Sequence, residues 1–188
     1  MKVSIFILIF LVFCGCTRQN TDIKNQEKQP IEERSQKNMK ITSQSFKEGE
    51  LMPEKYTCDG ANISPQLSFS DIPANTKSLA IISDDPDAPT GDWVHWVIYN
   101  IPPTTNELKE NFPRDKELKD GTKQGKNDFG KIGYDGPCPP GGIHRYYFKL
   151  YALDIVLEKD YGLTKKELLK AMEGHIIAET SLMGKYKR

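Results

Sequence analysis

Alternation of hydrophobic and polar positions predicts a chain built mainly from β-strands. A first strand is expected within 39–46, and the continuous apolar run at 77–83 is typical of a strand buried on both faces. Residues 93–101 are rich in β-branched and aromatic side chains and stop at a Pro-Pro pair, which predicts a central strand. Alternating segments at 144–154 and 176–186 predict two more strands. The pattern therefore predicts a mainly β domain.

One helix is expected between the last two strands. Thr164 and Glu167 form a capping-box sequence ahead of Leu168, Leu169 and Met172, and Gly174 is a typical helix end. His175 follows, and we expect a structural role for it at that helix end. The alternation of strands and helices typical of nucleotide-binding folds is missing, as are the phosphate loop, the nucleophile elbow and the zinc-protease helix motif.

The N-terminus carries a targeting pattern. The apolar run at 3–13 is shorter than the roughly 20 residues that span a bilayer, and its length suits a secretory signal. The sequence Phe-Cys-Gly-Cys at 13–16 resembles the lipobox of bacterial lipoproteins. It predicts a lipoprotein signal peptide at 1–15 and a lipid on Cys16, so that the protein is anchored to a bacterial membrane in the cell envelope, facing the periplasm or the exterior. A plain secretory signal is the alternative.

Composition divides the rest of the chain into two parts. Residues 16–38 are almost wholly polar or charged, which predicts a disordered linker. Residues 39–188 hold enough apolar positions for one globular domain. The 26 basic and 26 acidic residues of the 188-residue chain balance, so no overall field attracts nucleic acid, and we expect no nucleic-acid partner.

The candidate chemistry lies in two turn-rich loops, each of which runs into a predicted strand. They carry two of the three histidines beside acids and aromatic residues. The candidate ligand-binding residues are Asp85, Asp87, Trp93, His95, His144 and Tyr146. Alternation places His144 and Tyr146 on one strand face, and His95, Val97 and Tyr99 on one face of another.

These residue types suit an anion such as phosphate. A protonated imidazole donates hydrogen bonds near neutral pH, a carboxylate orients the ring, and a tyrosine hydroxyl adds a donor. Other interpretations stay open: His95 as a hydrogen-bonded core residue, 85–89 as a structural turn, or a two-histidine, one-carboxylate metal site. Because the histidines lack close ligand spacing, we expect neither a metal nor a cofactor. Cys58 and Cys138 could form a disulfide in an exported protein or remain free thiols.

With these residues in view, the domain resembles the phosphatidylethanolamine-binding protein family, in its bacterial YbhB/YbcL or Raf kinase inhibitor-like branch. The resemblance rests on the segments 56–65, 85–89, 93–96, 136–140, 144–146 and 184–188. It implies an antiparallel β-sandwich with a small anion pocket at one end, in which Asp85, His95 and His144 match the pocket and Tyr146 and Gly136 its rim. Val94 stands where eukaryotic members often have a first histidine, which weakens an analogy with kinase regulation.

The sequence therefore predicts a lipid-anchored binding protein that recognises a phosphate-bearing small molecule or a phospholipid head group. A different class of function is a protein-interaction module that inhibits a protease, a kinase or another enzyme through the long loop at 106–136. An enzyme is not expected, because no nucleophile stands beside the histidines.

Overall fold

The structure, a computed structural model, describes residues 38–188. The predicted signal peptide at 1–15, Cys16 and the predicted linker as far as residue 37 lie outside the described residues. Among the residues described, no helix is both long and apolar enough to cross a membrane.

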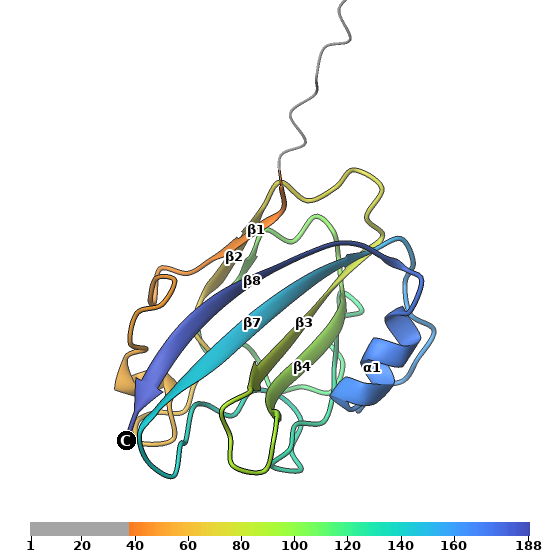
Figure 1. The fold of residues 1–188 in the computed structure, drawn as a ribbon. Coiled ribbons are helices and arrows are strands. Elements are labelled where there is room, and N and C mark those ends of the chain that lie inside the picture. The colour runs from red at the N-terminus through yellow and green to blue at the C-terminus, as the bar shows by residue number, and fades with distance from the viewer. Residues whose placement is uncertain (1–37) are drawn as a thin grey trace, which may run out of the picture. The chain divides into compact units, whose positions relative to one another are not determined.

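The described domain contains two antiparallel sheets and one α-helix (Figure 1). The smaller sheet has the order β1-β2-β5, with β1 at Lys40–Thr42, β2 at Leu67–Ser70 and β5 at Glu107–Leu108. The larger sheet has the order β6-β4-β3-β7-β8, with β3 at Ser78–Asp85, β4 at Trp93–Ile101, β6 at Lys123–Gln124, β7 at Ile143–Leu153 and β8 at Ile176–Lys187. The helix α1 spans Lys165–Met172, and a short 3-10 turn spans Glu54–Tyr56.

Both faces of the large sheet are covered. One face packs against the smaller sheet, and its core includes Ile41, Leu67 and Phe69 from that sheet. The other face packs against α1, whose buried residues are Leu168 and Met172. All eight residues of β3 are therefore buried, as the continuous apolar run predicted.

The prediction of a mainly β fold is confirmed, and the boundaries of β4 agree with the predicted strand at 93–101. The capping box is also confirmed: the Thr164 side chain accepts from the Glu167 amide, and the Glu167 carboxylate accepts from the Thr164 amide. The pattern did not predict β2, β5 and β6. The latter two have only two residues each, too few to show an alternation.

A β-bulge at His95 overturns one sequence prediction. Ser83 pairs with Trp96 and Asp84 pairs with Val94, so His95 is the extra residue on β4. The bulge ends the simple alternation. Val97 and Tyr99 pack on the helix side of the sheet, whereas the His95 ring contacts Tyr146, which belongs to the core on the opposite side. The prediction that His95 shares a face with Val97 and Tyr99 was wrong.

Candidate functional site

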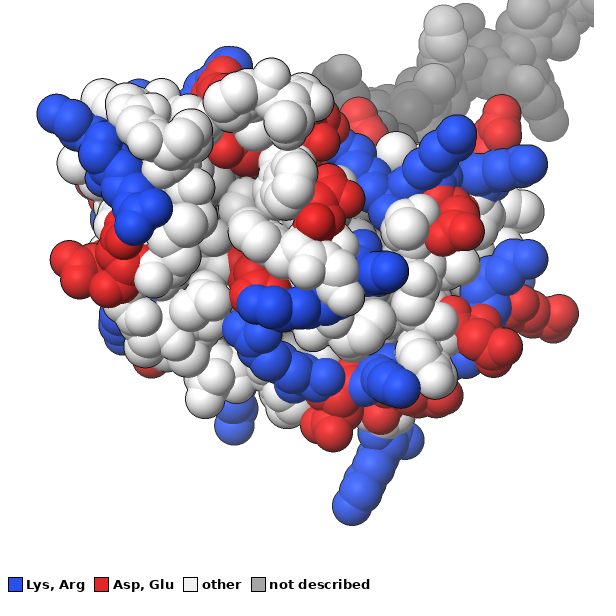
Figure 2. Space-filling view, turned by 90° about the horizontal axis from the view of Figure 1, so that it is seen from below, with Lys and Arg blue, Asp and Glu red and all other residues white. Residues whose placement is uncertain are grey.

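The candidate residues meet at one end of the large sheet. β3 ends there, and β4 and β7 begin there, at the lower end of the domain in Figure 1. Figure 2 views the domain from that end: charged side chains of both signs are interspersed with uncharged ones, so that neither sign dominates the surface. The local chemistry, rather than a broad field, must therefore determine what this end of the domain binds.

A buried carboxylate fixes the orientation of His144. The Nδ1 atom of His144 lies 2.7 Å from Asp85 Oδ2, and both side chains are buried. Since a carboxylate accepts hydrogen bonds, Nδ1 carries the proton and donates it. Asp85 Oδ1 accepts from the backbone amide of Asp87 at 2.8 Å, which also fixes the turn after β3.

The second histidine is held by a backbone carbonyl. Nδ1 of His95 lies 2.7 Å from the carbonyl oxygen of Asp135, whose own amide donates to the carbonyl of His95 at 3.0 Å. The His95 ring packs edge-on against Tyr146 and Phe129, with ring centroids 5.2 and 5.4 Å away. Burial lowers the pKa of His95, although the carbonyls of Asp135 and Gly136 and the charge of Asp85 favour the protonated ring.

Tyr146 provides a buried hydroxyl between these groups. The residue is 1% exposed, and within residues 38–188 its hydroxyl makes no well-formed hydrogen bond. Burial first, and then the nearby charge of Asp85, raises the pKa of Tyr146, so that the phenol keeps its proton. Asp85 and the Cys138 backbone also act on this hydroxyl without meeting well-formed hydrogen-bond geometry, so it could donate to a ligand.

Asp87 is predicted as a ligand-binding residue, but the structure pairs it with Arg145. The Arg145 guanidinium donates to both carboxylate oxygens, at 2.8 and 2.7 Å, and the Arg145 amide donates at 3.0 Å. The guanidinium lowers the pKa of Asp87 to about 2. Asp87 thus holds the turn against β7 and has little capacity left for a ligand.

Gly136 and Trp93 have different surroundings. The Gly136 amide donates to the Asn62 side chain at 2.7 Å, and a Cβ at this position would lie 2.1 Å from the Tyr56 carbonyl oxygen. Gly136 is therefore required for the close approach of two backbones. Trp93 is partly exposed and makes an edge contact with Phe129, at a centroid distance of 5.4 Å, so these two rings form an aromatic border beside His95.

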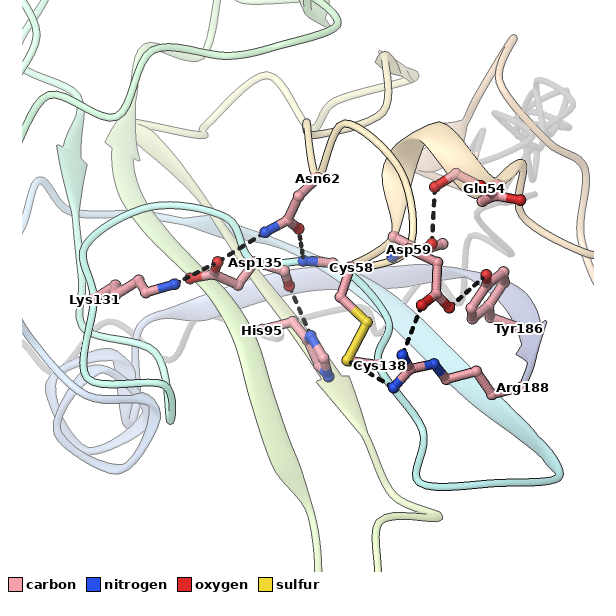
Figure 3. Close-up of a disulfide and its surroundings, with 12 residues drawn as sticks. Glu54, Cys58, Asp59, Asn62, His95, Lys131, Asp135, Cys138, Tyr186 and Arg188 are labelled. Carbon is pink, nitrogen blue, oxygen red and sulfur yellow. Dashed lines mark hydrogen bonds and ion pairs between the residues drawn. A yellow bond between two sulfur atoms is a disulfide. The ribbon is translucent and has the colours of Figure 1, made fainter.

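Sequence reasoning missed the network that holds the Asp135 segment (Figure 3). The buried Asp135 carboxylate accepts from Asn62 at 3.1 Å, from Asn127 at 2.9 Å and from Lys131 at 3.2 Å. Arg114 lies 3.8 Å from the same carboxylate. These contacts hold Asp135 in place. The same residue therefore provides both the buried carboxylate and the backbone carbonyl that orients the His95 ring. In the sequence, only the adjacent Gly136 pointed to this segment.

A disulfide joins Cys58 and Cys138 next to this network, with Cα atoms 5.4 Å apart (Figure 3). It ties the segment that carries Tyr56 to the segment that leads into β7. The end of β8 is fastened to the same place, because Asp59 accepts from Tyr186 at 2.9 Å and pairs with Arg188 at 2.8 Å.

Two features bear on what the site could hold. A cavity of about 460 Å³ lies between β1 and β8 and is lined by other residues, so the candidate site is defined by its chemistry and not by that cavity. Within residues 38–188, no group of three or more His, Cys, Asp or Glu side chains is arranged to hold a metal ion. The two histidines, the buried tyrosine and Asp85 form a compact polar cluster at one end of the large sheet.

The chain belongs to the phosphatidylethanolamine-binding protein family, whose sequence profile matches residues 42–187. A UPF0098 protein of Methanothermobacter thermautotrophicus is 53% identical over 150 residues, which cover 80% of this chain and 99% of the relative. A UPF0098 protein of Aquifex aeolicus is 50% identical over 153 residues, which cover 80% of this chain and 89% of the relative.

Solved structures agree with this assignment. The family homologue CT736 of Chlamydia trachomatis superposes with a TM-score of 0.75 at 48% identity, covering 80% of this chain and 98% of that one. YbcL of E. coli, described as a member of the mammalian family, superposes with a TM-score of 0.75 at 34% identity, covering 80% of this chain and 99% of that one. The expected resemblance to the YbcL-like branch and its β-sandwich fold is thereby confirmed.

Proposed function

We propose that this protein binds a phosphate-bearing small molecule or head group between His95, His144 and Tyr146, with Asp85 orienting His144. The observation that carries the proposal is the buried Tyr146 hydroxyl, which has no well-formed hydrogen bond within residues 38–188. A phosphate oxygen would satisfy this donor. The ring nitrogens of His95 and His144 that are not used by Asp135 and Asp85 would complete the contacts.

The proposal explains why Asp85 is placed behind His144. Asp85 accepts from Nδ1 of His144, which fixes the ring and leaves Nε2 for the ligand. Both side chains are buried, where water competes less for the ligand. The proposal does not depend on Asp87, whose carboxylate is paired with Arg145.

Isothermal titration of the full-length chain with inorganic phosphate and with phosphorylethanolamine tests this function. Tyr146→Phe removes only the hydroxyl, and we expect it to weaken binding at least about tenfold, because a buried hydrogen bond to a charged phosphate oxygen is lost. His144→Ala should abolish measurable binding. His175→Ala is the matched control, since His175 pairs with Asp154 at the surface. Undiminished binding by both site variants, or no binding by the wild type, would refute the proposal.

We further propose that Cys16 is lipidated and holds the domain at a bacterial membrane in the cell envelope, so that the membrane is a partner only through this anchor. The support is the lipobox-like sequence at 13–16 and the polar linker at 16–38. Cys16→Ser should move the protein from the membrane fraction to the supernatant and remove the acyl mass from the mature chain. Retention of the variant in the membrane fraction would contradict the anchor.

A further inference from the structure

Both histidines use the same ring atom to contact the protein. Nδ1 of His95 donates to the Asp135 carbonyl, and Nδ1 of His144 donates to the Asp85 carboxylate. A carbonyl and a carboxylate have no proton to give, so Nδ1 must carry the hydrogen in each ring. Nε2 is therefore the atom of each ring that is left for a ligand. Figure 3 shows the second nitrogen of His95 on the side of the ring away from Asp135.

Burial favours a neutral His95 ring, whereas the carbonyls of Asp135 and Gly136 and the two nearby carboxylates favour the protonated one. Asp85 and Asp135 are the acids that act on it, and Lys131 and Arg114 contact the Asp135 carboxylate and offset its charge. Burial has the larger effect and lowers the pKa of His95. Two aromatic rings, Tyr146 and Phe129, pack against the imidazole and add no charge at neutral pH. A neutral imidazole with its hydrogen on Nδ1 presents a lone pair at Nε2.

The site therefore combines an acceptor with a donor. Nδ1 of His95 makes the hydrogen bond to the Asp135 carbonyl, which leaves Nε2 as the ring's acceptor, and the Tyr146 hydroxyl makes no well-formed hydrogen bond within the described part of the chain. The pKa of Tyr146 is raised, so the hydroxyl remains a donor at neutral pH. A ligand that satisfies both atoms must offer a hydrogen at one point and an oxygen acceptor at another.

We propose that this site selects phosphate monoesters over phosphodiesters, because the P–OH of a monoester monoanion donates to His95 Nε2 while another phosphate oxygen accepts from Tyr146. This selectivity rests on the proposed function, namely that the site binds phosphate at all. A diester anion has no hydrogen on its phosphate oxygens. One of these oxygens would therefore place a lone pair against the lone pair of His95 Nε2. The phosphate within an intact phosphatidylethanolamine is a diester, and its free phosphorylated head group is a monoester.

The size of the preference follows from what each ligand must do. A monoester has a second pKa of about 6, so roughly half of it carries the required hydrogen at pH 6, which weakens its binding only about twofold. A diester must instead bind with His95 protonated, against the effect of burial, or leave a buried acceptor unpaired. Either route weakens binding typically tenfold or more. At pH 6 we therefore expect a monoester to bind at least about fivefold more tightly than a diester with the same organic group.

Isothermal titration of the full-length chain at pH 6 with phenyl phosphate and with methyl phenyl phosphate measures this ratio. Binding of both esters with equal affinity, or tighter binding of the diester, overturns the selectivity and leaves the proposed function standing. Failure of both esters and of inorganic phosphate to bind overturns both. Binding of the monoester with a diester affinity at least about fivefold weaker supports the selectivity.

Two further measurements separate this explanation from a general structural role of His95. His95→Gln replaces the ring by an amide that can donate as well as accept, so the ratio of the two affinities should fall toward one. His175→Gln is the control and should leave the ratio unchanged. In the wild type, the ratio should also narrow as the pH falls through the lowered pKa of His95, because the protonated ring then donates to either ester. A ratio that is the same at every pH refutes the role assigned to His95, whether or not His95→Gln folds.

Discussion

Removing the disulfide is predicted to lower the free energy of unfolding, because the unfolded chain gains conformational entropy. The native site should not be disturbed. The perturbation is the double substitution Cys58→Ala with Cys138→Ala. The two cysteines are 80 residues apart in sequence, and the chain-entropy relation for a loop of that length gives a stabilisation of about 4.5 kcal/mol. Measured contributions of disulfides are typically 2–4 kcal/mol, so we expect a loss of about 3–4 kcal/mol.

The native segments should stay together without the covalent link. Cys58 donates its amide to the Pro137 carbonyl at 3.0 Å, and the Tyr134 hydroxyl donates to the Tyr56 carbonyl at 2.8 Å. The bond from the Gly136 amide to Asn62 closes the same contact at 2.7 Å. None of these bonds uses a sulfur atom. Affinity for phosphate should therefore change less than about threefold while the free energy of unfolding falls.

Urea unfolding of three samples provides the assay: the oxidised wild type, the wild type with dithiothreitol, and the double variant. The last two should have the same free energy of unfolding, and both should show a larger m-value than the oxidised wild type, because the unlinked chain exposes more surface. A loss of less than about 1 kcal/mol would refute the loop-entropy reasoning. Further destabilisation of the double variant by dithiothreitol would show that the reductant acts elsewhere.

Three other substitutions test separate features of the domain. Gly136→Ala places a Cβ 2.1 Å from a backbone carbonyl oxygen and should lower the free energy of unfolding, measured by thermal unfolding, by about 3 kcal/mol or more. Gly141→Ala is the control, because a Cβ there meets open space, and it should leave the free energy of unfolding nearly unchanged. Asp87→Asn should lower the free energy of unfolding at pH 6 but much less at pH 2.5. The Asp87 carboxylate, whose pKa is about 2 in the folded protein, stabilises the fold above the pKa of the unfolded chain, near 4, and loses this effect as the pH falls from about 4 to 2. An equal loss of stability at both pH values would contradict this. Thr164→Ala removes the helix N-cap and should lower the free energy of unfolding by about 1 kcal/mol; no change would contradict the capping-box role.

Local pattern was sufficient to predict the long elements. β4 is rich in β-branched and aromatic residues and stops at a Pro-Pro pair, and β7 alternates after a glycine-rich loop. α1 is short, but its capping box marks its start. Where an element is held chiefly by its partners, the pattern fails. β6 is a two-residue strand that exists because Ile98 and Tyr99 of β4 pair with it, and no local signal predicts such a pairing.

The candidate site was predicted in part for a related reason. Asp85, His144 and Tyr146 follow from strand phase and proximity to a turn, and the structure brings them together. Asn62 and Asp135 were missed, because their contact joins residues 73 positions apart. The face of His95 was predicted wrongly, since a bulge inserts one residue without leaving a mark in the hydrophobic pattern.

That error matters for the chemistry, because the bulge determines which atom of His95 can meet a ligand. On a regular strand, the ring would lie on the helix side with Val97, away from Tyr146. The bulge instead brings the ring to the Asp135 carbonyl, which accepts a hydrogen bond from Nδ1. Nε2 is then the ring nitrogen that is left for a ligand. A sequence motif can name a histidine as a ligand residue, but whether that histidine gives or receives a hydrogen bond depends on the backbone group behind it. For this site, that group is the carbonyl of Asp135, and under the proposed function it decides whether an extra hydrogen on a phosphate would help or hinder binding.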